Sequence, residues 1–466
     1  MTIHLIGICG TAMATLAVML QDRGYRVQGS DQHVYPPMSD FLAARDITVL
    51  DGFDGERIDD SLDLVVIGNA VSRGNPEVEA TLDRKIRYRS LPEMVRETFL
   101  WERRSLVVAG THGKTTTTSL LAWVLTAGGR DPSFLVGGVT GNFGSSYRLG
   151  AGPEFVIEGD EYDSAFFDKT AKFLKYVPDV VVLGNLEFDH ADIYADVDGI
   201  RQAMARLVSL LPSRGRLMVG GDDPEALALG RAAPCPVETF GLGERAQWRA
   251  REVVADVGST RFVVTHDGQT EATVTLPLVG AFNVRNALAA FAVARHVGLD
   301  GESIARALSE FQGVRRRLEV RGRARDVTVF DDFAHHPTAV RETLAGVRAA
   351  HPDRRIWALF EPRSATACRR VFQRDFERAF DAADEVIIGR VFRASLPDEE
   401  RLSETELVDG ISRGGPCARH LPDVSAIVET VGAEAGAGDL VVVMSNGAFG
   451  GIHQKLLDRL AANEGL

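Results

Sequence analysis

Residues 107–121, VVAGTHGKTTTTSLL, decide the fold of the central part of this 466-residue chain. An apolar run over residues 106–109 predicts a buried strand, and residues 115–125 predict the start of a helix. A strand that passes through a glycine turn into a helix presents backbone N–H groups and the positive end of the helix dipole to an anion. The stretch therefore predicts a phosphate-binding loop.

The spacing of the glycines departs from the usual phosphate-loop pattern, G-x-x-x-x-G-K-[ST]. That pattern requires a glycine where Val108 stands, and this chain has Gly110 and Gly113 instead. A strand–turn–helix unit with a surface lysine is the alternative interpretation. We favour the phosphate loop, in which Lys114 reaches the terminal phosphates of a nucleotide and Thr115 offers its hydroxyl to Mg²⁺.

On both sides of this loop, short β-rich apolar runs alternate with helical stretches, which is typical of parallel α/β sheets. We predict three α/β domains. These are a Rossmann-like domain over residues 1–101, a central domain over 102–315 with the parallel sheet of a P-loop ATPase, and a second Rossmann-like domain over 316–466. Residues 247–276 alternate apolar and polar side chains, which predicts a small antiparallel rim on the central sheet.

Composition limits the classes of function. The net charge of −13 argues against a broad nucleic-acid-binding surface. The four cysteines are scattered without a C-x-x-C pair, which favours a reducing compartment over a disulfide framework or a cysteine zinc site. The start of the chain lacks the basic segment of a signal peptide, and no run of about 18 apolar residues occurs. We therefore expect a cytoplasmic protein without membrane insertion.

A second nucleotide-binding pattern lies near the start of the chain. GICGTAM, residues 7–13, follows a predicted strand and opens a helix, but Cys9 stands where the dinucleotide-binding pattern has its second glycine. Asp31 ends the next strand, where it could meet a ribose hydroxyl, and NAVS, residues 69–72, ends another. Because the carboxyl ends of parallel strands form the ligand crevice, we predict a diphosphate site here. An NAD-type domain and a generic tight turn remain alternatives.

Acidic stretches follow two further predicted strands of the central domain. Glu158 lies in VIEGDEYDSAFFD, residues 156–168, and His190 lies in LGNLEFDHADIY, residues 183–194. Mg²⁺ prefers hard oxygen ligands beside substrate phosphates, and Glu158 could supply one. His190 could bind a second metal ion through its neutral imidazole. A hydrogen-bonded structural histidine is the alternative, but the acidic surroundings favour the metal site.

Two asparagines open a predicted helix in GAFNVRNALAA, residues 280–290. Asn283 and Asn286 are three residues apart and share one face of the first turn. Paired amides could bind the edge of an adenine base, although capping of the helix by asparagine would explain them equally well.

Five motifs in order along the chain resemble those of the Mur ligases, the ATP-dependent amide ligases of bacterial cell-wall synthesis: GTHGKTTT, NLEFDHAD, FNVRNALAA, FQGVRRRLE and DDFAHHPTAV. The resemblance covers the whole chain, and the short glycine spacing is that family's variant of the loop. GICGTAM and SDQHVYPP are similar to the branch that binds UDP-N-acetylmuramate, which implies UDP rather than NAD in the first domain.

The resemblance implies ATP and Mg²⁺ as cofactors. Two reactions of the family are compatible with it. One joins L-alanine to UDP-N-acetylmuramate. The other joins the recycled tripeptide L-alanyl-γ-D-glutamyl-meso-diaminopimelate to the same acceptor through an acyl phosphate. EGDEYDSAFFDK, LEFDHADIY, FEPRSAT and MSNGAFGGIH are similar to the members that add the peptide, so we expect the tripeptide. QAMARLVSLL lacks the carbamylated metal-bridging lysine of the later-acting ligases, which agrees with the muramate-using branch but leaves fewer identifiable ligands for the second metal.

Carried over motif by motif, the resemblance implies five groups of site residues. The catalytic group is Lys114, His190, Arg317 and His335. The ATP group, in which Asp332 takes the ribose, is Gly110, Thr111, His112, Gly113, Lys114, Thr115, Thr116, Asn283, Asn286, Arg316 and Asp332. The UDP-sugar group is Gly7, Gly10, Thr11, Ala12, Met13, Ser30, Asp31, Asn69 and Ala70. The metal group is Thr115, Glu158 and His190, and the peptide group is His335, Arg363, Ser445 and Asn446.

Two functions of other classes stay open. A nicotinamide-dependent oxidoreductase would use the first domain but leave the loop at residues 110–115 without a role. A non-catalytic sensor of UDP-sugars would not need Glu158 and His190. Phosphate release that depends on UDP-N-acetylmuramate would separate a ligase from both.

Overall fold

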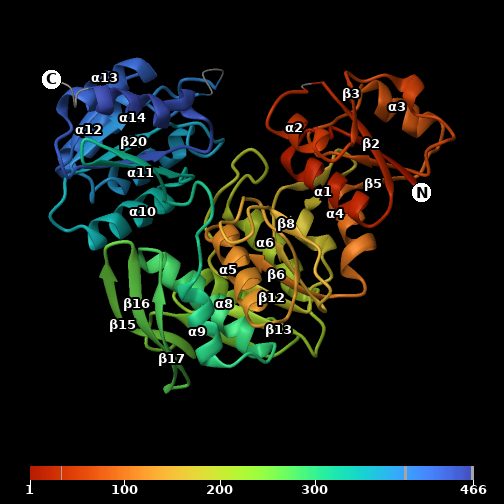
Figure 1. Cartoon of the computed structure of the whole chain (residues 1–466), viewed down its shortest axis with the longest axis horizontal. Helices are drawn as coiled ribbons and strands as arrows, with labels where there is room; N and C mark the ends of the chain where they lie inside the picture. Colours follow the sequence, from red (N-terminus) through yellow and green to blue (C-terminus); the bar gives the residue numbers. More distant parts are fainter. Residues whose placement is uncertain (33, 393–395, 463–466) are drawn as a thin grey trace.

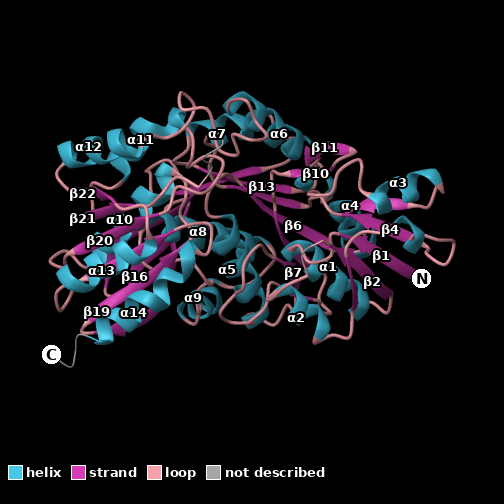
Figure 2. Ribbon diagram, turned by 90° about the horizontal axis from the view of Figure 1, so that it is seen from above, coloured by secondary structure: helices cyan, strands magenta, loops and turns pink. Residues whose placement is uncertain are grey.

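The computed structural model describes residues 1–32, 34–392 and 396–462, so position 33 of the SDQHVYPP motif lies outside the described residues. Three large β-sheets organise the chain, and helices cover their faces (Figures 1 and 2). The predicted fold class is confirmed, because mostly parallel sheets alternate with helices and antiparallel strands extend the central sheet. The residue boundaries of the three domains stay a prediction.

The first domain holds a five-stranded parallel sheet in the order β3-β2-β1-β4-β5. This order places β1 at the centre. β2 and β3 are added on one side of it and β4 and β5 on the other, as in doubly wound nucleotide-binding folds. The strands are β1 (Thr2–Ile6), β2 (Arg26–Asp31), β3 (Thr48–Asp51), β4 (Leu64–Ile67) and β5 (Tyr88–Ser90). The α-helices are α1 (Thr11–Asp22), α2 (Met38–Ala43), α3 (Pro76–Asp83) and α4 (Leu91–Val95).

The central domain is built on a ten-stranded sheet in the order β17-β16-β15-β14-β13-β12-β6-β9-β7-β8. Its middle strands are parallel and almost fully buried, which explains their continuous apolar runs. These strands are β6 (Arg104–Ala109), β9 (Glu154–Glu158), β12 (Val180–Leu183) and β13 (Arg216–Gly220). The parallel strands β7 (Ser133–Leu135) and β14 (Val237–Gly241) flank them, and β8 (Tyr147–Arg148) pairs antiparallel with β7 at the edge of the sheet. A separate small hairpin joins β10 (Asp163–Ala165) to β11 (Asp168–Ala171).

The predicted antiparallel rim is confirmed. It consists of β15 (Trp248–Asp256), β16 (Ser259–His266) and β17 (Gln269–Leu276), and Figure 1 shows it extending from the edge of the central domain. β17 alternates exposed and buried residues, as expected for a sheet with one face in water.

Helices α5 (Lys114–Ala127) and α8 (Ala281–His296) pack against each other beside the central sheet. The first turns of α5 contain four consecutive threonines, whose β-branched side chains favour strands when isolated. Burial against the sheet and α8 overrides that preference, and the hydroxyls of Thr118 and Ser119 donate to carbonyls one turn back at 2.8 and 2.7 Å. The other helices of this domain are α6 (Val197–Ser209), α7 (Pro224–Gly230) and α9 (Gly301–Ser309).

The third domain has a six-stranded sheet in the order β18-β19-β23-β20-β21-β22, in which only β18 runs antiparallel to its neighbour. The strands are β18 (Glu319–Ala324), β19 (Val327–Asp332), β20 (Ile356–Phe360), β21 (Glu385–Ile388), β22 (Cys417–His420) and β23 (Leu440–Met444). The helices are α10 (Pro337–Ala350), α11 (Gln373–Ala379), α12 (Glu404–Gly414), α13 (Val424–Glu434) and α14 (Ile452–Ala462).

The third domain contacts the central domain through α10, which touches α8 and β15 (Figure 1). His336 caps the start of α10 by accepting a hydrogen bond from the Thr338 backbone, and Pro337 occupies the first helical position. None of the helices in the described ranges is long and apolar enough to cross a membrane.

Candidate active site

The phosphate loop joins β6 to α5, as the sequence predicts. Gly110 and Gly113 both adopt positive φ, at 125° and 83°, a conformation that glycine adopts without a steric penalty. A side chain at Gly113 would collide with the amide oxygen of Asn286 on α8. The alternative of a plain turn with a surface lysine is not supported, because Lys114 is largely buried beneath the loop.

Lys114 is held at three points. Its Nζ donates to the backbone oxygens of Gly110 (2.8 Å) and Thr111 (3.1 Å) and to Oε1 of Glu161 (2.8 Å). Burial disfavours the charged amine, but the carboxylate of Glu161 outweighs it and raises the pKa of Lys114. The loop therefore carries a fixed positive charge at neutral pH.

Glu158, Thr115 and Arg317 form a polar group beside Lys114. The Thr115 hydroxyl donates to Oε1 of Glu158 at 2.9 Å, and Nη2 of Arg317 lies 3.1 Å from the same hydroxyl. The backbone N–H of Gly137 donates to Oε2 of Glu158 at 2.7 Å. Burial raises the pKa of Glu158 above its usual value, although the neighbouring cations and hydrogen bonds oppose that shift.

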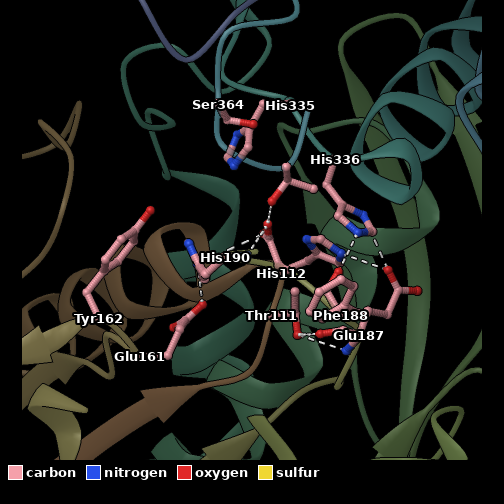
Figure 3. Close-up of polar contacts among 12 residues, drawn as sticks. Thr111, His112, Glu161, Tyr162, Glu187, Phe188, His190, His335, His336 and Ser364 are labelled. Carbon is pink, nitrogen blue, oxygen red and sulfur yellow. Dashed lines mark hydrogen bonds and ion pairs between the residues drawn. The ribbon is translucent and has the colours of Figure 1, made fainter. Parts of the chain in front are cut away.

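His190 pairs with Glu161 rather than with Glu158. Nε2 of His190 lies 2.8 Å from the same Glu161 oxygen that accepts from Lys114, as Figure 3 shows for the Glu161–His190 contact. Burial lowers the pKa of His190, but the bond to Glu161 outweighs it and the net shift is upward. Sequence reasoning missed Glu161, whose only signal was its place in the acidic stretch EGDEYD.

The donor set fits a divalent cation. Thr115 and Glu158 bring a hydroxyl and a carboxylate together beside the phosphate loop, which are the hard oxygen ligands that Mg²⁺ prefers. Oε2 of Glu161 is buried without a hydrogen-bond partner among the described residues, and such an orphaned carboxylate oxygen next to His190 suits a second ion. Glu161 is thus a further candidate ligand for the second site.

A cavity of about 560 Å³ opens over the loop and is lined by both the central and the third domain. Asn283, Asn286 and Asp332 all line it. The alternative of asparagine capping is not supported, because α8 begins after Gly280 with no side-chain cap. Nδ2 of Asn286 instead donates to Oδ1 of Asn283 at 3.3 Å. Asp332 accepts from two backbone N–H groups, of Leu318 and Ala334.

Arg316 and Arg317 are neighbours in sequence but turn to different sides. Arg317 lines the cavity. Arg316 donates to the carbonyls of Ser445 and Gly447 at 2.7 Å and lies 3.5 Å from Asp331, all within the third domain. The structure therefore does not bring Arg316 to the cavity over the loop, because its guanidinium is used to anchor the end of β23.

A second cavity of about 370 Å³ adjoins the first, and Tyr162, Asp189, His190, Phe333 and His335 line both. His335 is partly buried, and loss of solvent lowers its pKa, which favours the neutral ring. Arg363 lines the second cavity with its guanidinium over the Phe392 ring, 3.7 Å from the centroid. Asn446 also lines it, and its amide oxygen has no hydrogen-bond partner among the described residues.

Ser445 does not reach this cavity. Its hydroxyl is buried, donates to Glu361 at 2.5 Å and accepts from the Gly447 backbone at 2.9 Å. The predicted contact between the Ser445 side chain and a peptide is not supported in this conformation, because both hydrogen-bonding functions of the hydroxyl are used to shape the loop.

In the first domain, the predicted UDP-sugar residues gather at the carboxyl ends of β1, β2 and β4. Gly10, Thr11, Ala12, Asn69 and Ala70 are exposed there, and α1 starts after Gly10 without a side-chain cap. Its first N–H groups are therefore open to an anion.

The remaining UDP-sugar residues are more enclosed. Gly7 has a φ of 82°, and Asp31 accepts from the backbone of Cys9 at 2.9 Å, which ties the first two loops together. Met13 is a buried residue in the first turn of α1, and the fully buried Ser30 hydroxyl donates to Glu77. A contact between the Ser30 side chain and a ligand is therefore not supported, because that hydroxyl faces the interior.

Family models match the chain in three consecutive segments. They are described as the Mur ligase family catalytic domain over residues 2–100, the Mur ligase middle domain over 108–294, and the Mur ligase glutamate ligase domain over 316–447.

Three individual proteins show the extent of the similarity. The UDP-N-acetylmuramate–L-alanyl-γ-D-glutamyl-meso-2,6-diaminoheptandioate ligase of Escherichia coli is 43% identical over 99% of this chain and 98% of its own length. The UDP-N-acetylmuramate–L-alanine ligase of Rubrobacter xylanophilus is 36% identical over 99% of this chain and 100% of its own length. The crystal structure of a murein peptide ligase from Psychrobacter arcticus superposes with a TM-score of 0.72, at 36% identity over 99% of both chains. With the matched segments in the same order as its three sheets, this chain belongs to the Mur ligase family.

Proposed function

We propose that this chain is an ATP-dependent amide ligase that joins the tripeptide L-alanyl-γ-D-glutamyl-meso-diaminopimelate to UDP-N-acetylmuramate in the recycling of cell-wall peptide. The observation that carries the proposal is the pair of adjoining cavities. One holds the phosphate loop, and the other offers Arg363 and Asn446 to a second substrate. The similarity to the Escherichia coli ligase named for this tripeptide supports the choice of amine.

The chemistry proceeds in two stages. The terminal phosphoryl group of ATP moves to the lactyl carboxylate of UDP-N-acetylmuramate, which gives an acyl phosphate and ADP. The free amine of the tripeptide then attacks the acyl carbon, the tetrahedral intermediate collapses, and phosphate leaves as the amide forms and the amine loses a proton. Phosphoryl transfer depends mainly on positioning and on neutralising charge.

The residues of the first cavity fit these demands. Lys114 and Arg317 bring positive charge to the phosphate loop, and Asn283, Asn286 and Asp332 would hold the nucleoside. Thr115, Glu158 and His190 would hold Mg²⁺, which when bound supplies further neutralisation of phosphate charge. The acyl phosphate is labile in water, and the third domain, which covers the cavity, would protect it.

The residues of the second cavity would receive the incoming peptide. Arg363 would pair with a carboxylate of the tripeptide, and a guanidinium can do so through two parallel hydrogen bonds. His335 lines both cavities and would lie beside the amine. We further propose that the reaction takes place in the cytoplasm, with small molecules as the only substrates.

The decisive experiment compares the two amines at matched concentration. Phosphate release is measured with ATP, Mg²⁺ and UDP-N-acetylmuramate plus either the tripeptide or free L-alanine, and the coupled product is confirmed by mass. We expect strong ligation of the tripeptide and weak or no ligation of alanine. Efficient alanine coupling with an inert tripeptide would instead assign the alanine ligase reaction.

Replacing Glu158 by glutamine is expected to raise the Mg²⁺ concentration needed for half-maximal activity by roughly tenfold or more, since a neutral amide is a poorer ligand for a hard cation. Titration of Mg²⁺ at saturating ATP measures this. Asp163→Asn, which breaks the surface pair between Asp163 and Lys169 (2.5 Å), is the control and should leave the Mg²⁺ dependence unchanged. An unchanged Mg²⁺ requirement in the glutamine variant would remove Glu158 from the metal site.

The same titration tests whether Glu158 and His190 serve one metal ion. If they do, Glu158→Ala and His190→Ala each raise the Mg²⁺ requirement and their combined effect is non-additive, because residues of one site act as a unit. Additive losses, with a normal Mg²⁺ dependence in His190→Ala, would favour a structural role for His190 beside Glu161.

A further inference from the structure

Residues 185–189 follow β12 and lie between the phosphate loop and the third domain. On one side, Oδ1 of Asn185 accepts a hydrogen bond from the backbone N–H of His112 at 2.8 Å. The Thr111 hydroxyl lies 3.1 Å from the backbone oxygen of Glu187 and 2.9 Å from its backbone nitrogen. The segment therefore holds two consecutive residues of the phosphate loop, Thr111 through its hydroxyl and His112 through its backbone N–H.

On its other side, the same segment is docked on the third domain. The Phe188 ring stacks on Phe372, with centroids 5.5 Å apart, and the Phe188 carbonyl accepts from Nε2 of His336 at 3.1 Å. Asp189 is buried and accepts from the hydroxyl of Thr366 at 2.5 Å. A movement of the third domain must therefore carry this segment with it or break these contacts.

The Glu187 side chain lies between the phosphate loop and the start of α10, where the rings of His112 and His336 also approach each other to 4.7 Å between centroids (Figure 3). Its Oε2 lies 2.9 Å from Nε2 of His112 in the phosphate loop, and the Thr338 side chain bonds it to the start of α10. Nδ1 of His336, the cap of α10, lies 3.5 Å from Oε2 but does not donate to it, because this nitrogen accepts from the Thr338 backbone. Although its partial burial favours the protonated acid, bonds to His112 and to Thr338 lower the pKa of Glu187 to about 2. It is thus a carboxylate at neutral pH, placed where the dipole of α10 stabilises an anion.

The cluster of His112, Glu187 and His336 brings three possible metal-ligand atoms within 4.8 Å of one another. Both ring nitrogens of His336 are already used, however. Nε2 donates to the Phe188 carbonyl, and Nδ1 accepts from the backbone N–H of Thr338. Burial lowers the pKa of His336 to about 4, so the ring stays neutral with its proton on Nε2. Both nitrogens of His336 therefore make hydrogen bonds within the protein, and we base no metal site on this cluster.

We infer that Glu187 is a positioning residue that couples docking of the third domain to the conformation of the phosphate loop. With α10 in place, the carboxylate is fixed between the helix start and His112, and the loop is held in the shape that receives phosphates. With α10 withdrawn, Glu187 loses that support and its hold on His112 weakens. The third domain also lines the proposed peptide cavity. Binding of the peptide, if it shifts the third domain, would therefore alter nucleotide binding through this carboxylate. The inference rests on the proposed function only for the identity of the nucleotide.

The test is a double-mutant cycle on binding of a non-hydrolysable ATP analogue with Mg²⁺ to the full-length protein, measured by calorimetry. One change is His112→Gln in the phosphate loop, and the other is Thr338→Val at the start of α10. Each single change is expected to weaken binding of the analogue by some factor. With Glu187 present, the affinity loss of the double variant should be about fivefold smaller than the product of these two factors, because the two residues share Glu187 as a partner. In the Glu187→Gln background, the two losses should simply multiply.

A matched control uses a carboxylate that joins the same domains elsewhere. Glu342 on α10 pairs with Arg285 on α8 at 2.7 Å and makes no hydrogen bond or ion pair with the phosphate loop among the described residues. In the double-mutant cycle of His112→Gln with Glu342→Gln, the two losses in affinity for the analogue should therefore multiply. Melting temperatures confirm folding of each variant, and Glu187→Asp, whose shorter carboxylate should give a weaker coupling, replaces Glu187→Gln if that variant unfolds.

Two results would overturn the inference. One is multiplicative behaviour of His112→Gln and Thr338→Val while Glu187 is intact, and the other is coupling that persists fully without Glu187. Both are read from nucleotide binding alone. A failed ligation assay with the tripeptide would therefore reject the proposed substrate and leave this coupling test standing, whereas multiplicative losses in an active ligase would reject the coupling only.

Discussion

Lys114→Ala is expected to lower turnover by at least about 10²–10³-fold, because removing a preorganised donor that stabilises transferring charge costs this much in other enzymes. In the structure the Lys114 amine is held in place by two loop carbonyls and Glu161, which makes it a preorganised donor. Binding of UDP-N-acetylmuramate should remain largely intact, since the residues predicted for it lie in the first domain. Steady-state phosphate release and calorimetry with UDP-N-acetylmuramate measure the two effects.

Lys172 provides a control of the same kind. It has the same 13% side-chain exposure as Lys114 and pairs with Asp160 at 2.6 Å in the same acidic stretch, but it lines neither cavity. Lys172→Ala should therefore retain near-normal turnover. If Lys114→Ala turned over at the same rate as Lys172→Ala, the assignment of the loop to phosphate chemistry would be wrong.

Arg363→Ala is expected to lower kcat/KM for the tripeptide by roughly 10- to 100-fold, the cost of losing hydrogen bonds to a charged partner. The effect should fall on the KM of the peptide, while the KM values of ATP and UDP-N-acetylmuramate stay close to normal. The guanidinium is already oriented by the Phe392 ring and lies 3.8 Å from Glu361. Binding of a carboxylate therefore costs little side-chain conformational entropy.

Arg363→Lys separates charge from geometry, because an ammonium keeps the charge but cannot form the planar pair of hydrogen bonds. It should recover only part of the loss. Arg369→Ala, which removes a nearby arginine paired with Glu400 at 3.2 Å, should leave the KM of the peptide unchanged. A normal KM in Arg363→Ala would exclude this arginine from the peptide site.

Local sequence was sufficient to predict the elements that build the site. The glycine turn before Lys114 works because Gly113 needs a positive φ and the helix starts at the next residue, both of which are properties of a short segment. The alternation over residues 247–276 likewise predicted the antiparallel rim, since the side chains of a strand alternate between its two faces.

The direction of individual side chains was harder to predict. Arg316 and Arg317 occupy one motif, yet Arg316 anchors β23 and Arg317 lines the cavity over the loop. The hydroxyls of Ser30 and Ser445 lie beside predicted sites but face the interior. In each case the motif places the backbone, and packing against distant segments decides where the side chain points.

The sequence by itself determined the fold class, the strand–glycine turn–helix unit at Lys114 and the family, because these depend on periodicity, on turn residues and on ordered motifs. Only the tertiary structure showed Glu161 beneath Lys114 and His190, which are 47 and 29 residues from it in the chain. It alone placed Glu187 between the phosphate loop and α10, where His336 is 149 positions further along. Such pairings arise when separate strands end at one edge of a sheet and another domain docks there, so no local pattern in the sequence encodes them.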